Sequence, residues 1–219
     1  MSNILEVKAL TFKYKGKDSI SVLDNMNDVF SSGKLYAILG SSGSGKSTYM
    51  SLLGGLEKPT AGEILYKGKD IWQGNVNEYR NRHIGMVFQS YNLLEYMNGT
   101  QNILTAMEIT KNVVEEPEKR CKELLDRVGI DSETAKRNVR KISGGEQQRI
   151  AIARALGKGA DIILADEPTG NLDEETAAEI MELFLRIVHE DDKCVILVTH
   201  SKQLASRADV VVHIRKNSV

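Results

Sequence analysis

Cysteine is scarce in this sequence: only Cys121 and Cys194 occur among 219 residues. Two isolated cysteines are too few for a disulfide framework or a cysteine metal cluster in a chain of this size, and they fit a reducing compartment. Cys121 also falls in helical phase with Leu124, Leu125 and Val128, so we interpret it as a small core residue.

Long apolar runs are absent as well. Residues 195–198 are continuously apolar, but this run is far shorter than the roughly 20 residues that a bilayer crossing needs. The N-terminal residues 1–6 lack the basic start and apolar stretch of a secretion signal. We therefore expect a cytoplasmic chain that reaches the inner face of the cell membrane only as a peripheral subunit, through a partner.

No charge of one sign is in excess, since the formal net charge is -1. The chain has no global basic field, so its charge indicates no nucleic-acid partner. Hydrophobic residues make up 41% and charged residues 27%, close to the averages of globular proteins. With no internal repeat and no low-complexity linker, the length favours one α/β domain with a smaller inserted lobe.

The spacing of apolar residues predicts strands at both ends of the chain and helices in the middle. Short strand patterns occur at residues 5–9, 35–39, 63–66, 162–165, 194–199 and 210–214. Helical spacing prevails over residues 100–156, most clearly over 118–128 with Gly129 as a stop, and returns over 174–190. Strands that alternate with helices imply a parallel sheet.

A glycine-rich loop follows the strand at 35–39 and precedes a helical stretch at 47–53. It matches the pattern G-x-x-x-x-G-K-[ST] with Gly40, Ser41, Ser42, Gly43, Ser44, Gly45, Lys46 and Ser47. Backbone N–H groups of such a loop point at phosphate oxygens, and Lys46 would reach the β and γ phosphates. Ser47 is placed to ligate Mg²⁺, with Thr48 as a second hydroxyl. The motif predicts nucleotide phosphate binding.

Two acids end the apolar strand at 162–165. Taken alone, such a pair is usually a solvated turn. Beside a phosphate loop, however, Asp166 is a candidate Mg²⁺ ligand that would hold the ion through a water molecule. Glu167 points elsewhere and is a candidate general base that polarises the attacking water. The pair therefore indicates hydrolysis of the bound nucleotide.

Residues 142–147, Ile-Ser-Gly-Gly-Glu-Gln, resemble the signature sequence of ABC ATPases and lie between the phosphate loop and the acid pair, as in that family. The resemblance covers nearly the whole chain and implies roles for four further residues. It matches Tyr14 to the adenine-stacking aromatic, Gln89 to the glutamine loop that contributes to the Mg²⁺ site, Asp173, with Asn171 and Leu172 before it, to the D-loop, and His200 to the switch histidine. Taken alone, Tyr14 could equally be a packed strand aromatic, and a lone strand-end histidine is more often structural.

The family resemblance implies an α/β P-loop NTPase core with a mainly parallel sheet, an N-terminal antiparallel β portion and an inserted helical lobe. Residues 1–90 and 158–219 would form the catalytic core, and about 91–157 the helical lobe with the signature. ATP and Mg²⁺ are the implied cofactors.

The signature segment itself predicts a second phosphate site. Ser143 can cap a helix that begins at Gly144, which leaves the N–H groups of Gly144 and Gly145 free to approach a phosphate. One chain cannot fold both sites around one ATP, so the family's solution is a head-to-tail homodimer in the ATP-bound state. Glu146 replaces the more frequent glutamine, and with Ser143 it forms the S-x-x-E pattern of a capping box.

Residues 88–94 and 165–173 look like the group of macrolide-exporter, lipoprotein-release and antimicrobial-peptide-resistance ATPases. This resemblance implies an ATP-hydrolysing subunit that energises a separate membrane permease, which would dock on the stretch after Gln89, and that exports or extracts a lipid, peptide or drug-like cargo. The alternative is an ABC ATPase that regulates a membrane protein in cell division or signalling without transport.

Overall fold

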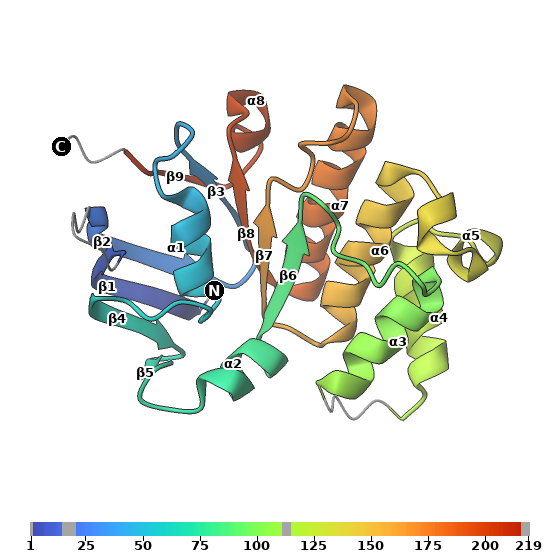
Figure 1. Cartoon of the computed structure of the whole chain (residues 1–219), viewed down its shortest axis with the longest axis horizontal. Coiled ribbons are helices and arrows are strands. Elements are labelled where there is room, and N and C mark those ends of the chain that lie inside the picture. Colours follow the sequence, from blue (N-terminus) through green and yellow to red (C-terminus); the bar gives the residue numbers. More distant parts are fainter. Residues whose placement is uncertain (1, 15–20, 111–114, 216–219) are drawn as a thin grey trace.

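Two sheets and eight α-helices make up the described part of the chain, residues 2–14, 21–110 and 115–215 of a computed structural model (Figure 1). One sheet is antiparallel, with strand order β2-β1-β4-β5, and the other is parallel, with order β6-β7-β8-β3-β9. The strands are β1 (Asn3–Lys13), β2 (Ser21–Ser31), β3 (Lys34–Leu39), β4 (Ala61–Tyr66), β5 (Lys69–Asp70), β6 (Ile84–Phe88), β7 (Ile162–Asp166), β8 (Cys194–Thr199) and β9 (Val210–His213). The predicted α/β fold with a parallel sheet and an antiparallel N-terminal portion is confirmed.

The helices form a group at one end of the molecule and a second set around the parallel sheet. They are α1 (Lys46–Leu53), α2 (Val76–Arg82), α3 (Gly99–Ile109), α4 (Pro117–Arg127), α5 (Ser132–Lys136), α6 (Gly144–Gly157), α7 (Glu174–Asp191) and α8 (Lys202–Ala205). Figure 1 shows α3, α4 and α5 together at the end opposite the antiparallel sheet, with α6 between them and the parallel sheet.

Both faces of the parallel sheet are buried, which explains its continuous apolar runs. Successive residues of a strand point to opposite faces. Leu35 and Ala37 of β3 therefore belong to the core cluster that includes α6 and α7. Tyr36 and Ile38 belong to the second cluster, which α1 and the antiparallel sheet complete. The phosphate loop between β3 and α1 thus follows a strand that is packed against a core cluster on each face.

The N-terminal antiparallel sheet is larger than the sequence predicts. The strand expected at 5–9 is the middle of β1, which has 11 residues. Its partner β2 was not expected, because the β1–β2 register shifts several times and Asn25 has a φ of 49°, so the regular alternation of buried residues breaks down. Bulges of this kind remove the period-two pattern on which a strand prediction depends.

A polar cluster joins the two sheets at the start of β7. Tyr66 and Asp161 share a hydrogen bond, the Tyr66 hydroxyl lies 3.0 Å from His83 Nδ1, and Lys67 Nζ lies 3.1 Å from the Asp161 carboxylate. Hydrogen bonds from His83, Tyr66 and Lys67 hold the pKa of Asp161 well below its usual range, against the opposing effect of its burial. Burial and the bond to Asp161 raise the pKa of Tyr66 to about 12.

Asp161→Asn is expected to lower the melting temperature by about 2–6 °C at pH 7, because the cluster loses about 1–2 kcal/mol of charge-assisted hydrogen bonding. A carboxyl with a lowered pKa in the folded state stabilises the fold above its unfolded pKa of about 3.9, and this stability is lost as the pH falls through the lower folded value. The difference from the native chain should therefore shrink below about pH 4. Calorimetry across pH checks this, with the exposed Asp126→Asn as control; a pH-independent difference would contradict it.

Candidate functional site

The phosphate loop has the backbone that its motif predicts. Gly43 and Gly45 have φ values of 73° and 96°, a left-handed conformation that favours glycine. Gly45 is the N-cap of α1, and the first turn of α1 contains no acidic residue. The positive end of this helix dipole is therefore not offset by a carboxylate in that turn, which suits an anion.

Lys46 is nearly buried at the base of the loop, with 7% of its surface exposed. Its ammonium group donates to the carbonyl oxygens of Gly40 and Ser41, both at 2.9 Å. These bonds keep a cation at the centre of the loop that would otherwise be costly to bury. The loop thus combines N–H groups, a helix terminus and a positive charge.

A cavity of about 480 Å³ lies above this loop. Most of the predicted loop residues line it, together with side chains from three distant parts of the chain. The lining residues are Tyr14, Val22, Ser42, Gly43, Gly45, Lys46, Ser47, Thr48, Glu167 and His200. The structure therefore brings the phosphate loop, the second acid and the strand-end histidine to one cavity. Val22 lies on the unexpected strand β2 and belongs to no motif, so its place in this cavity was not predicted.

Asp166 ends β7 beside the loop, where a hydrogen bond joins its carboxylate to the Ser47 side chain. Burial raises the pKa of Asp166 and the neighbouring Glu167 charge adds to this, while Ser47 and Lys46 act in the opposite direction. The hydroxyl and carboxylate oxygens are the hard ligands that Mg²⁺ prefers. The described residues include no group of three or more His, Cys, Asp or Glu side chains able to hold a metal, so a cation here would need phosphate or water oxygens as well.

Glu167 departs from the strand conformation of Asp166, with a φ of 42°. A left-handed backbone is unfavourable for a non-glycine residue and is often found at functional sites. The Glu167 side chain lines the cavity above the loop. The Glu167 carboxylate lies 2.9 Å from His200 Nδ1, so the acid and the histidine form a pair at the cavity.

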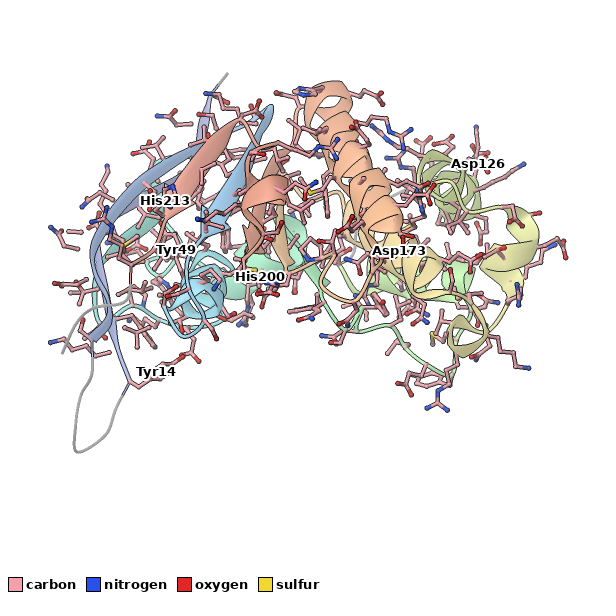
Figure 2. The ribbon with its side chains drawn as sticks, turned by 90° about the horizontal axis from the view of Figure 1, so that it is seen from above. Tyr14, Tyr49, Asp126, Asp173, His200 and His213 are labelled. Atoms are coloured by element: carbon pink, nitrogen blue, oxygen red, sulfur yellow. The ribbon has the colours of Figure 1, made fainter. Side chains whose placement is uncertain are left out.

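Tyr14 lies at the edge of the same cavity with 54% of its surface exposed. Its hydroxyl is 3.0 Å from Thr48 Oγ1, and its ring meets Phe12 edge to face at 5.0 Å between centroids. Figure 2 shows His200 between Tyr14 on one side and Asp173, at the start of α7, on the other. Tyr14 is thus a strand-end aromatic with a free ring surface beside the loop.

Gln89 and Asp173 do not line this cavity among the described residues. Gln89 follows β6, and its Nε2 donates to Asn171 Oδ1 at 3.0 Å. Asp173 caps α7 by accepting hydrogen bonds from the backbone N–H and the hydroxyl of Thr176, at 2.9 and 2.7 Å. These bonds lower the pKa of Asp173. The sequence did not predict the Gln89–Asn171 contact, because 82 residues separate the two.

The signature segment has the predicted capping box at the start of α6. Ser143 Oγ accepts from the Glu146 N–H at 3.2 Å, and the Glu146 carboxylate accepts from the Ser143 N–H at 2.7 Å. A side chain at Gly144 would meet the Tyr91 hydroxyl at 2.7 Å, and one at Gly145 would meet Thr176 at the same distance. The glycines therefore permit close packing, and the described residues of this segment do not line the loop cavity.

A phosphate loop between β3 and α1, an acid pair at the end of β7 and a histidine after β8 define a P-loop nucleotide hydrolase. The family profile described as "ABC transporter" matches residues 23–170. The uncharacterised ABC transporter ATP-binding protein YclH of Bacillus subtilis is 44% identical, over 99% of this chain and 95% of its own length. The lipoprotein-releasing system ATP-binding protein LolD of Idiomarina loihiensis is 37% identical, over 99% and 96%.

A solved dimeric structure, the post-hydrolysis state of the ATP-binding cassette MJ0796 bound to ADP and Pi, superimposes with a TM-score of 0.87 at 33% identity, over 98% of this chain and 97% of that one. The chain therefore belongs to the ABC transporter family of ATP-binding proteins, and it is an ATPase. These relatives give no support to the regulatory alternative. Among the helices of the described residues, none has both the length and the apolar character that a membrane crossing needs.

Proposed function

We propose that this ATPase works as a head-to-tail homodimer that drives a separate membrane permease. The observation that supports this most is the separation of two phosphate-binding elements within one chain. The loop cavity is lined by Lys46, Ser47, Glu167 and His200, but not by the described signature residues. Two such half-sites are completed when a second copy places its signature segment over the first copy's nucleotide.

In this proposal each predicted site residue has an assigned role. Lys46 binds the β and γ phosphates, Tyr14 stacks on adenine, and Glu167 accepts the proton of the attacking water. His200 contacts the γ-phosphate and keeps Glu167 oriented through their 2.9 Å contact. Ser143, Gly144 and Gly145 of the partner copy close the site, while Glu146 holds Ser143 in place and Asp173 fixes the start of α7. The other residues of the segment 40–48 supply N–H and hydroxyl groups to the phosphates.

Mg²⁺ fits the oxygen ligands at the end of β7. Ser47 and Asp166 would hold it, directly or through water, and Gln89 would join them after leaving its contact with Asn171. The ion would neutralise charge on the phosphates during transfer.

Residues 1–90 and 158–219 would form the catalytic core and about 91–157 the helical lobe, so that the lobe carries the signature and the core carries the loop.

A groove between β6 and α3 supports permease binding. It has a volume of about 330 Å³ and is lined by Asn81, Met86, Phe88, Asn92, Ala106, Ile109, Thr110, Arg154, Ala155 and Lys158. Ile109 has 68% of its surface exposed, so an apolar side chain is available to an apolar segment of a partner. Through this contact the chain would sit at the inner membrane face. The similarity to the lipoprotein-releasing protein LolD and to macrolide export proteins favours export or extraction of a lipid, peptide or drug-like cargo.

Ile109→Glu is expected to release the chain from a membrane protein that co-purifies with it, because a carboxylate replaces exposed apolar surface and is costly to bury against an apolar segment of that protein. The measurement is recovery of the membrane protein with affinity-tagged chain from detergent-solubilised membranes. Leu56→Glu, at an exposed apolar residue outside the groove, is the matched control and should retain the partner. Equal recovery with both variants would contradict the proposed docking surface.

A further inference from the structure

Asn171 forms a reciprocal amide pair with Gln89. Gln89 Nε2 donates to Asn171 Oδ1 at 3.0 Å, and Asn171 Nδ2 donates to the Gln89 carbonyl oxygen at 3.2 Å. Gly170 makes room for this contact, since a Cβ there would lie 2.8 Å from Gln89 Nε2. The pair fixes both the side chain and the backbone of Gln89.

On one side the pair is attached to the turn that holds the second acid. The N–H of Gly170 donates to the carbonyl oxygen of Glu167 at 3.0 Å, and Leu172 N–H donates to Thr169 at 3.1 Å. This tight turn starts at Glu167, whose backbone is left-handed. Asn171 is therefore connected to the backbone of Glu167 through one hydrogen-bonded turn.

On the other side the pair is attached to the wall of the groove. Phe88, directly before Gln89, and Asn92, three residues after it, line the groove between β6 and α3. Arg154 of α6 donates to the carbonyl oxygens of Tyr91 and Asn92, and burial lowers the pKa of Arg154. The segment 88–92 is thus held by α6 at its far end and by Asn171 at its near end.

We propose that Asn171 is a positioning residue that holds Gln89 outside the phosphate cavity until Mg²⁺ and ATP bind. The inference rests on the proposed function, in which Gln89 joins the Mg²⁺ site. Gln89 does not line the cavity in the described structure, and its side-chain amide can turn toward the Mg²⁺ ligands only after the hydrogen bond from Nε2 to Asn171 Oδ1 breaks. A binding-competent state that is only partly populated lowers the apparent affinity by that fraction. Removing the pair should therefore strengthen binding of ATP with Mg²⁺.

The test is an equilibrium titration with ATP in the Glu167→Gln background, where hydrolysis does not interfere. Asn171→Ala is expected to tighten ATP binding by about three- to tenfold with Mg²⁺, the range that one net hydrogen bond represents. With EDTA in place of Mg²⁺ its affinity should stay within about twofold of the background. With Gln89→Ala added, Asn171→Ala should give no gain, because the restrained side chain is then absent.

Asn3→Ala, at an exposed position of β1, is the matched control and should leave both affinities unchanged. Asn171→Ser also loses both bonds, suits a turn, and keeps the test decisive if the alanine variant does not fold. No gain with Mg²⁺, an equal gain with EDTA, or a gain that persists with Gln89→Ala would overturn the inference alone. A background chain that binds no ATP would overturn the proposed function and the inference with it.

Discussion

Glu167→Gln is expected to reduce ATP hydrolysis by about 10²- to 10⁴-fold while ATP still binds, because the amide keeps the size of the carboxylate but cannot accept a proton. The amide oxygen can still accept a hydrogen bond from His200, so the geometry of the pair is preserved. Phosphate release by the purified variant measures hydrolysis, and calorimetric titration measures binding.

Glu63→Gln, at an exposed position of β4, is the control for loss of a carboxylate elsewhere and should hydrolyse ATP at the native rate. A Glu167→Gln chain that hydrolyses ATP within about tenfold of the native rate would show that another group activates the water. His200 would then be the next residue to examine, since it is the side chain that contacts Glu167 at 2.9 Å.

Lys46→Ala is expected to weaken ATP binding itself by about 10- to 100-fold, the range of charge-assisted hydrogen bonds to phosphate. The variant also loses the two bonds from Lys46 Nζ to the carbonyl oxygens of Gly40 and Ser41, so the loop would be less well ordered before ATP binds. Titration with ATP and Mg²⁺ gives the affinity.

Lys69→Ala, on β5 at the edge of the antiparallel sheet opposite β2, is the matched control and should bind ATP normally. A melting curve separates a loop effect from loss of the fold, because Lys46 is nearly buried. Native affinity in Lys46→Ala would contradict the assignment of this loop as the phosphate site.

Local patterns were sufficient to predict the parts of the fold that are short-range in origin. The strand at 194–199 matches β8, and the S-x-x-E pattern gives the capping box of Ser143 and Glu146. Each of these depends on residues within one element, where hydrophobic period and side-chain chemistry decide the outcome. The strand β2 was not predicted because Asn25 and the register shifts break its period.

The candidate site could be predicted as a set of residues but not as an arrangement. Motif order indicates that the loop, Glu167 and His200 belong together, and the parallel sheet does bring them to one cavity. Contacts between distant residues left no local signal. The Gln89–Asn171 pair and the bonds of Arg154 to the 91–92 carbonyl groups join segments more than 60 residues apart, so only the folded chain places Gln89 beside Asn171.

The pairing of two half-sites in a dimer is the central claim, and the molar mass of the Glu167→Gln chain with and without ATP tests it most directly. Light scattering after gel filtration should give the 24.3 kDa monomer without nucleotide and twice that mass with ATP and Mg²⁺, with one ATP bound per chain. Adding Ser143→Arg, which places a bulky side chain at the signature, should keep the chain monomeric although it still binds ATP. A Glu167→Gln chain that binds ATP and remains at 24.3 kDa would contradict the shared site.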